Sequence, residues 1–142
     1  MVQKLAWIFG TVFLVIGVLG FVPGITSGGM LLGLFEVDAM HNIVHILSGI
    51  LALAAAMGAG MYARLYFKVF GVVYGLVAVL GLAMGGTVLG MHMNMLDHVL
   101  HVAIAAAALY IGFALKDAPM HMSMSSAPES NPAPMQSSGS MM

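Results

Sequence analysis

Histidine and carboxylate side chains recur at helical spacing in two apolar stretches of the chain. One stretch carries His41 and His45, and the other carries Asp97, His98 and His101. Because residues three or four apart share one face of an α-helix, each set forms a polar stripe. Imidazole and carboxylate groups are ligands that zinc and copper accept in proteins. We therefore predict that the two stripes meet and gather these five side chains into a candidate metal site.

Three interpretations of this cluster are open at the level of sequence. The groups can hydrogen-bond across the two helices and lock them together, with His41 and Asp97 as a natural pair. They can bind copper or zinc, with His41, His45, Asp97 and His101 as a four-ligand set. The third interpretation is a b-type haem held by His45 and His101, although the small residues around them do not by themselves indicate a porphyrin slot.

Methionine surrounds histidine at two further places, and both segments read Met-His-Met-x-Met. Thioether and imidazole ligands together select Cu(I). Methionine is also a flexible apolar filler, so packing explains some of these side chains equally well. The candidate accessory ligands are Met91, His92, Met93, Met95, Met120, His121, Met122 and Met124.

The amino-acid composition indicates whether these candidate ligands lie in a soluble protein or in a membrane protein. Of the 142 residues, 61% are hydrophobic and only 6% are charged, whereas soluble domains carry about 25% charged residues. We therefore predict an integral membrane protein whose first partner is the lipid bilayer. A net charge of −1 with four basic residues argues against nucleic-acid binding. The absence of cysteine excludes disulfides and thiolate metal sites.

Four apolar stretches are close to the length that a membrane-spanning helix needs. They cover about residues 5–22, 39–60, 66–89 and 95–115. The predicted fold is all-α: a four-helix membrane bundle over residues 1–116, with Asp38 and Asn94 as N-caps of the second and fourth helices. Residues 25–35 are apolar but too short to cross, so we predict an interfacial or re-entrant segment there. Residues 117–142 are rich in Met, Ser and Pro and are predicted to be a disordered tail.

The basic residues predict the orientation of this bundle. Lys4, Arg64, Lys68 and Lys116 all fall on the side that carries both termini. The positive-inside rule then places both termini in the cytoplasm. The two Met-His-Met segments consequently lie on opposite sides of the membrane and cannot form one site.

The chain also reads as two tandem helical hairpins. Residues 9–21 align with residues 70–82 at an offset of 61, and the second and fourth spans align at an offset of 56. In that second alignment Asp38 corresponds to Asn94, and His45 corresponds to His101. Each copy contains two spans, so the pseudo-two-fold axis is predicted to run along the membrane normal.

The sequence gives little support for a catalytic function. No nucleophile elbow, phosphate-binding loop or Ser-His-Asp order occurs. We expect a non-enzymatic membrane protein that handles metal, or an accessory subunit of a larger membrane complex. Glycine-rich helix faces make self-association into a homo-oligomer a further expectation.

Several motifs of the chain resemble a family of small bacterial four-helix membrane proteins, domain of unknown function 4383. The resemblance covers roughly residues 5–115. It is carried by the runs 20–24 (Gly-Phe-Val-Pro-Gly), 31–38 (Leu-Leu-Gly-Leu-Phe-Glu-Val-Asp) and 41–45 (His-Asn-Ile-Val-His). In the fourth span the family pattern reads Asp-Asn-x-x-His, which Asp97 and His101 match, whereas His98 replaces the Asn. The resemblance implies a four-helix protein of a bacterial inner membrane and supplies no activity.

Overall fold

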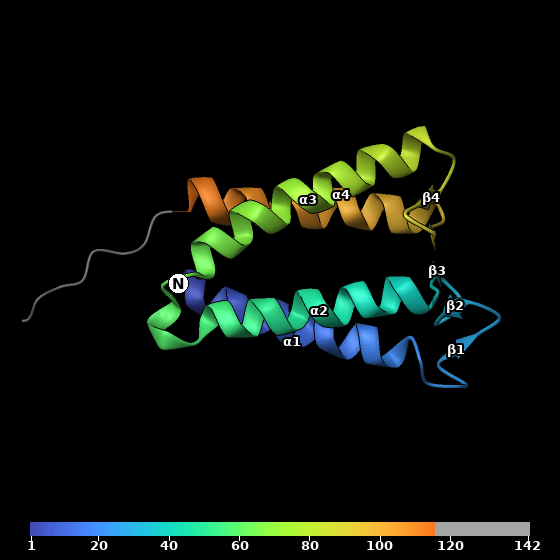
Figure 1. The fold of residues 1–142 in the computed structure, drawn as a ribbon, viewed down its shortest axis with the longest axis horizontal. Helices are drawn as coiled ribbons and strands as arrows, with labels where there is room; N and C mark the ends of the chain where they lie inside the picture. The colour runs from blue at the N-terminus through green and yellow to red at the C-terminus, as the bar shows by residue number, and fades with distance from the viewer. Residues whose placement is uncertain (116–142) are drawn as a thin grey trace, which may run out of the picture.

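The computed structural model of the chain describes residues 1–115, apart from the side chain of Ala59. Four long helices dominate these residues, and each is long and apolar enough to cross a membrane (Figure 1). The predicted tail over residues 117–142 lies outside the described residues. The helices are α1 Val2–Leu19, α2 Ala39–Ala56, α3 Ala63–Ala83 and α4 Met95–Leu109, which continues as a π-helical turn over Tyr110–Ala114.

The helices associate in two pairs. α1 packs along α2, and α3 packs along α4, whereas contacts between the pairs are fewer (Figure 1). A 3-10 turn over Gly58–Gly60 leads from the first pair to the second. At 1.5 Å per residue, the 18 residues of α2 extend about 27 Å, which is close to the thickness of a bilayer core.

The helix ends differ from the predicted spans because glycines interrupt the apolar stretches. α2 ends at Ala56, before Gly58 and Gly60, which both have positive φ. α3 ends at Ala83, before Gly85 and Gly86 at φ +72° and +94°. Since glycine adopts this conformation without a steric cost, these residues turn the chain out of the helix. Hydropathy alone cannot locate such ends.

Short antiparallel strands connect the two helices of each pair at one end of the bundle. In the first connection, β1 Thr26–Ser27, β2 Met30–Leu31 and β3 Phe35–Glu36 form a small sheet, with Leu31 opposite Phe35. In the second, β4 Thr87–Val88 pairs with β5 Met91–His92. The predicted interfacial or re-entrant segment is therefore a sheet of three strands. Its turn glycines, Gly28, Gly29 and Gly33, all have positive φ, as an irregular backbone requires.

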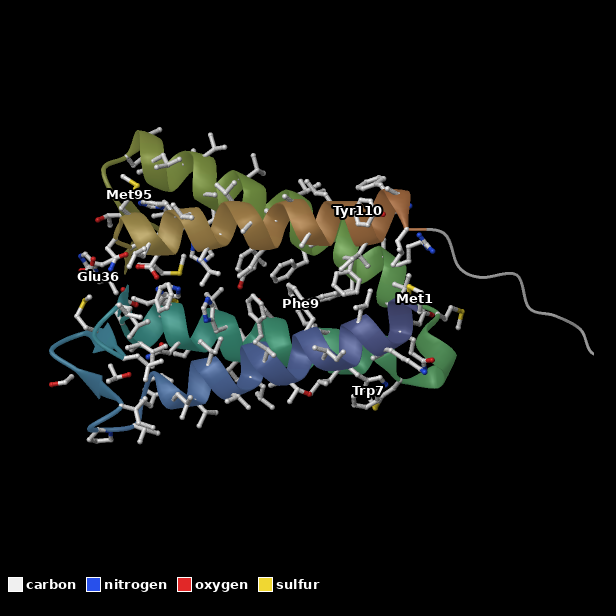
Figure 2. The ribbon with its side chains drawn as sticks, turned by 180° about the vertical axis from the view of Figure 1, so that it is seen from behind. Met1, Trp7, Phe9, Glu36, Met95 and Tyr110 are labelled. Atoms are coloured by element: carbon white, nitrogen blue, oxygen red, sulfur yellow. The ribbon has the colours of Figure 1, made fainter. Side chains whose placement is uncertain are left out.

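Aromatic side chains fill the space between the two helix pairs. Phe9 and Phe13 of α1 meet Phe70 of α3 in edge-to-face contacts at 4.9 and 5.2 Å between ring centroids. Figure 2 shows the side chain of Phe9 directed between α1 and α4. Such rings bury large apolar areas and fix the relative orientation of the pairs.

The outer faces of the helices are apolar as well. Aliphatic side chains on α1, α2 and α3 are about half-exposed or more, among them Val12, Ile50, Leu76 and Val79. A water-soluble protein of this size would not display so much contiguous apolar surface. The outward faces therefore suit contact with lipid.

Charged residues separate toward the two ends of the described bundle. Lys4, Arg64 and Lys68 lie at the end that carries Met1, where Arg64 donates to the carbonyl of Leu115 at 2.8 Å. Glu36, Asp38 and Asp97 lie at the strand end, and Figure 2 shows Glu36 beside Met95 there, opposite Met1 and Tyr110.

Candidate metal centre

Three histidines from two helices converge in the half of the bundle nearest the strands. His41 and His45 lie one turn apart on α2, and His101 lies in the second turn of α4. Each offers one ring nitrogen such that the three nitrogens lie within 4.8 Å of one another. We call these residues the histidine triad. Residues on separate helix pairs thus form one cluster, as the polar stripes predict.

Two of the triad residues are buried and His45 is partly buried, and all three carry unsatisfied polar atoms. His41 and His101 are 3% and 4% exposed. Within residues 1–115, Nδ1 of His41, Nε2 of His45 and Nδ1 of His101 are buried and have no hydrogen-bond partner. A buried polar group without a partner costs about 1–3 kcal/mol, so these nitrogens are candidates to bind a ligand.

Aromatic residues enclose the triad. The ring of Phe13 lies 5.1 Å from His45, and the ring of Tyr74 lies 5.6 Å from His101. The Tyr74 hydroxyl is hydrogen-bonded to Oγ of Ser48 at 2.9 Å. The sequence analysis did not identify Tyr74. A tyrosine within an apolar span was the available signal, since a buried hydroxyl needs a partner.

Asp97 has a different role from the one predicted. Its Oδ2 accepts hydrogen bonds from the backbone N–H of Asn94 at 2.8 Å and of Glu36 at 3.0 Å. The first completes a capping box with Asn94, and the second joins α4 to the sheet of the first helix pair. The predicted His41–Asp97 pair is therefore not formed. A carboxylate at the third helical position reaches back to the cap and not inward to the neighbouring helix.

His98 is also not part of the triad. It is 4% exposed and contacts α3, where a Cβ added to Gly81 would come within 2.9 Å of its Nδ1. That Nδ1 has no hydrogen-bond partner within the described residues. His98 and His101 are three residues apart, but the turn between them is enough to direct His98 into its own helix pair. The predicted set of five thus reduces to three.

The Met-His-Met segment at residues 91–95 does not converge on one point. Met91 and Met93 are buried, whereas Met95 and His92 are exposed. This alternation follows from the extended backbone of β5, in which successive side chains point to opposite faces. The second segment, with Met120, His121, Met122 and Met124, lies outside the described residues.

The predicted caps form, and both also bond to the other helix pair, Asn94 by donating from Nδ2 to the carbonyl of Leu34 at 2.8 Å. Asp38 accepts from the backbone N–H of His41 through Oδ1 at 2.8 Å, and from that of His92 through Oδ2 at 2.8 Å. Partial burial works to raise the pKa of Asp38, but these backbone hydrogen bonds and the nearby His92 imidazole outweigh it and hold the pKa below its ordinary value. Asp38 therefore joins α2 to the second helix pair, much as Asp97 joins α4 to the first.

Comparison with known proteins identifies the family and nothing beyond it. No curated protein and no solved structure matches the chain. A family model, described as a domain of unknown function (DUF4383), matches residues 3–114. Apart from Val2 at the start of α1, these residues include all four helices, the strands and the histidine triad. The chain therefore belongs to the DUF4383 family.

Proposed function

We propose that this protein is a non-enzymatic membrane protein that binds one zinc or copper ion through His41, His45 and His101. The observation that carries the proposal is the convergence of three ring nitrogens within 4.8 Å of one another, on two buried histidines and one that is partly buried. Neutral imidazoles suit both metals. Because the ligands come from α2 and α4, an ion held there would also stabilise the association of the two helix pairs.

The triad supports a single ion better than a haem. The His41 ring centroid lies 4.6 Å from that of His45 and 5.7 Å from that of His101. A haem held by His45 and His101 would lie midway between their two rings. The ring of His41 lies close to that midway plane and would occupy the space that the porphyrin needs. Hydrogen bonding within the cluster is also poorly supported, since each triad histidine keeps a buried nitrogen without a partner in residues 1–115.

The orientation and the internal repeat belong to the same proposal. The positions of Lys4, Arg64 and Lys68 at one end of the bundle support a cytoplasmic location for that end, in a bacterial inner membrane. The repeat is supported by backbone geometry in the two connections. Leu32 and Leu89 share the rare φ of +53°, and each is followed by a glycine at positive φ.

The experiment is metal analysis of the full chain, purified in detergent with a removable tag that contains no histidine. We expect near-stoichiometric zinc or copper. His101→Ala should weaken binding by about 100-fold or more, since altering even residues that support metal ligands costs 10–100-fold. His98→Ala is the matched control, because it removes a buried histidine of the same helix that does not face the triad, and it should retain the ion.

The result that contradicts the proposal is equally plain. Absence of metal after reconstitution with zinc and with copper would reject it. Equal loss of metal in both variants would reject the assignment of His41, His45 and His101 as ligands. Iron with a Soret band would replace the single ion by a haem.

A further inference from the structure

The two strand connections share a turn of unusual composition. Leu32 and Gly33 lie at the centre of the turn between β2 and β3, and Leu89 and Gly90 lie at the centre of the turn between β4 and β5. All four residues have positive φ, from +53° at the two leucines to +81° at Gly90. Positive φ at both central residues is the mark of a type I′ turn, whose first central residue is normally Asn, Asp or Gly. The chain places a leucine there twice.

Both leucine side chains are exposed on the isolated chain, Leu32 to 66% and Leu89 to 83%. The left-handed backbone conformation crowds the Cβ of leucine against its own carbonyl group, so the conformation itself disfavours this residue. Water disfavours the exposed apolar side chain as well. A residue held in a rare conformation at the surface calls for an interaction that offsets the strain. Its occurrence at two separate turns points to apolar surroundings at both.

The position of Leu32 identifies these surroundings as lipid. Its side chain borders an apolar cavity of about 350 Å³ between α1 and α4, together with Ile16 and Leu19 of α1. It is therefore continuous with the apolar flank of a membrane-spanning helix. The 18 residues of α1 and of α2 extend about 27 Å, slightly less than the hydrocarbon core of about 30 Å. The turns that follow α1 consequently begin at the boundary of the core.

The backbone and the charge of both connections permit contact with lipid. Lipid tails offer no hydrogen-bond partners, so a segment at that depth has to pair its own backbone groups. The N–H of Leu32 donates to the carbonyl of Ile25 at 2.9 Å, and the strands on either side of each turn pair with one another. Residues 20–35 and 84–91 contain no charged side chain. Insertion of the turns therefore leaves no charge in the lipid.

The opposite end of the bundle carries anchors of a different kind. Tryptophan and tyrosine usually gather at both interfaces of a membrane protein. Within residues 1–115, the exposed members of this class are Trp7, Tyr62 and Tyr110. Figure 2 shows Trp7 and Tyr110 at the end that carries Met1, and Tyr62 directly precedes α3 at that end. The strand end of the described chain has no exposed tryptophan or tyrosine, and the leucine turns occupy that end instead.

We propose that Leu32 and Leu89 insert into the boundary between headgroups and acyl chains in the leaflet at the strand end, and that they anchor this end of the bundle. The partner is the acyl-chain region of the lipid, because neither turn offers a cation to a headgroup. Burial of each leucine in lipid offsets the unfavourable conformation of its backbone. The inference goes beyond the proposed function and does not depend on an ion at the triad.

The test is the immersion depth of nitroxide labels on the full chain in nanodiscs of phosphatidylcholine and phosphatidylglycerol. The chain has no cysteine, so Leu32→Cys and Leu89→Cys each place one label. Power saturation compares collisions with oxygen, which dissolves in lipid, and with a nickel chelate, which stays in water. We expect oxygen collisions to exceed nickel collisions at both positions. Ser27→Cys is the matched control, because Ser27 is an exposed polar residue of the same small sheet, and nickel collisions should dominate there.

A second pair of variants keeps both leucine positions free of label. With the label on Leu34→Cys, the double change Leu32→Asn and Leu89→Asn suits the turns but removes their apolar side chains, and it should shift the label toward water. Leu32→Met with Leu89→Met should leave the label in place. Nickel dominance at Leu32 or Leu89 in pure lipid overturns the anchor and indicates a surface for another protein. Oxygen dominance at Ser27, or an unmoved label in the Asn variant, overturns the assignment to the two leucines.

Discussion

The polar residues of α2 and α4 that the proposed repeat aligns agree at some positions and differ at others, and the comparison shows what selects a ligand in this fold. Asn42 and His98 are aligned by the proposed repeat, and both are buried against a glycine: Gly20, which caps the end of α1, and Gly81 of α3. An amide fills this place in one pair and an imidazole in the other. The space beside the glycine therefore determines where the His98 side chain lies, and the capacity of imidazole to bind metal does not.

The preceding residues, His41 and Asp97, have different contacts. His41 on α2 joins the triad, whereas Asp97 on α4 bonds to backbone N–H groups at the cap end. His45 and His101, one turn further on, both belong to the triad. The first helix pair thus contributes two histidines to the triad and the second contributes one, and under the proposed repeat the exchange of His for Asp accounts for the asymmetry.

The largest effect should come from the glycine contacts that bring α1 and α2 together. A Cβ added to Gly49 would lie 2.7 Å from the backbone N of Leu14 and 2.8 Å from the carbonyl of Gly10. Backbone atoms cannot move aside easily, so Gly49→Ala should lower the free energy of unfolding by about 3 kcal/mol. Titration with denaturing detergent in mixed micelles measures it.

Gly75→Ala on α3 is the matched control for that substitution. Its Cβ would meet only the Cβ of Ala105, at an ordinary 3.8 Å. It should leave stability unchanged or raise it by up to about 1 kcal/mol, because alanine is the better helix former. Equal losses in the two variants would mean that close approach is not what distinguishes these contacts.

The next effect concerns the two carboxylates that join the helix pairs. Asp97 is 3% exposed and accepts two backbone N–H groups, so Asp97→Ala should cost about 2 kcal/mol. Asp38 is more exposed, and Asp38→Ala should cost about 1 kcal/mol, as an N-cap usually does. The same unfolding titration ranks them, and the reverse order would contradict the roles given to the two caps.

The smallest effect is the dependence of stability on pH at Asp38. Its pKa is lower in the folded protein than its ordinary value of 3.8. The ionised carboxylate therefore adds stability that is fully present above pH 3.8 and is lost as pH falls through the lowered value. Asp38→Asn should flatten the decline of unfolding free energy in acid. A decline as steep as that of the wild type would assign it to other groups.

Helical periodicity predicts much of the fold and of the site. The apolar stretches locate four helices, the small polar residues before them locate the caps of α2 and α4, and the four-residue spacing of His41 and His45 places both on the inner face. These features depend on residues close together in the chain. They could be inferred without knowing how the helix pairs meet.

The remaining features depend on contacts between distant residues. Whether Asp97 faces the triad or Glu36 depends on where β3 lies, and the direction of His98 depends on the space that Gly81 leaves. The role of Tyr74 depends on the approach of α3 to His101. Sequence spacing on one helix does not determine these contacts. His98 and His101 are both inward positions of α4, yet His98 contacts α3 and His101 joins the triad.

The central claim is that His41, His45 and His101, and no other histidine, hold the ion. X-ray absorption at the zinc edge of the zinc-loaded protein tests it most directly. The account predicts three imidazole nitrogens at about 2.0 Å, with one fewer in His101→Ala and an unchanged spectrum in His98→Ala. A first shell of oxygen ligands alone, or a spectrum that changes with His98→Ala and not with His101→Ala, would contradict it.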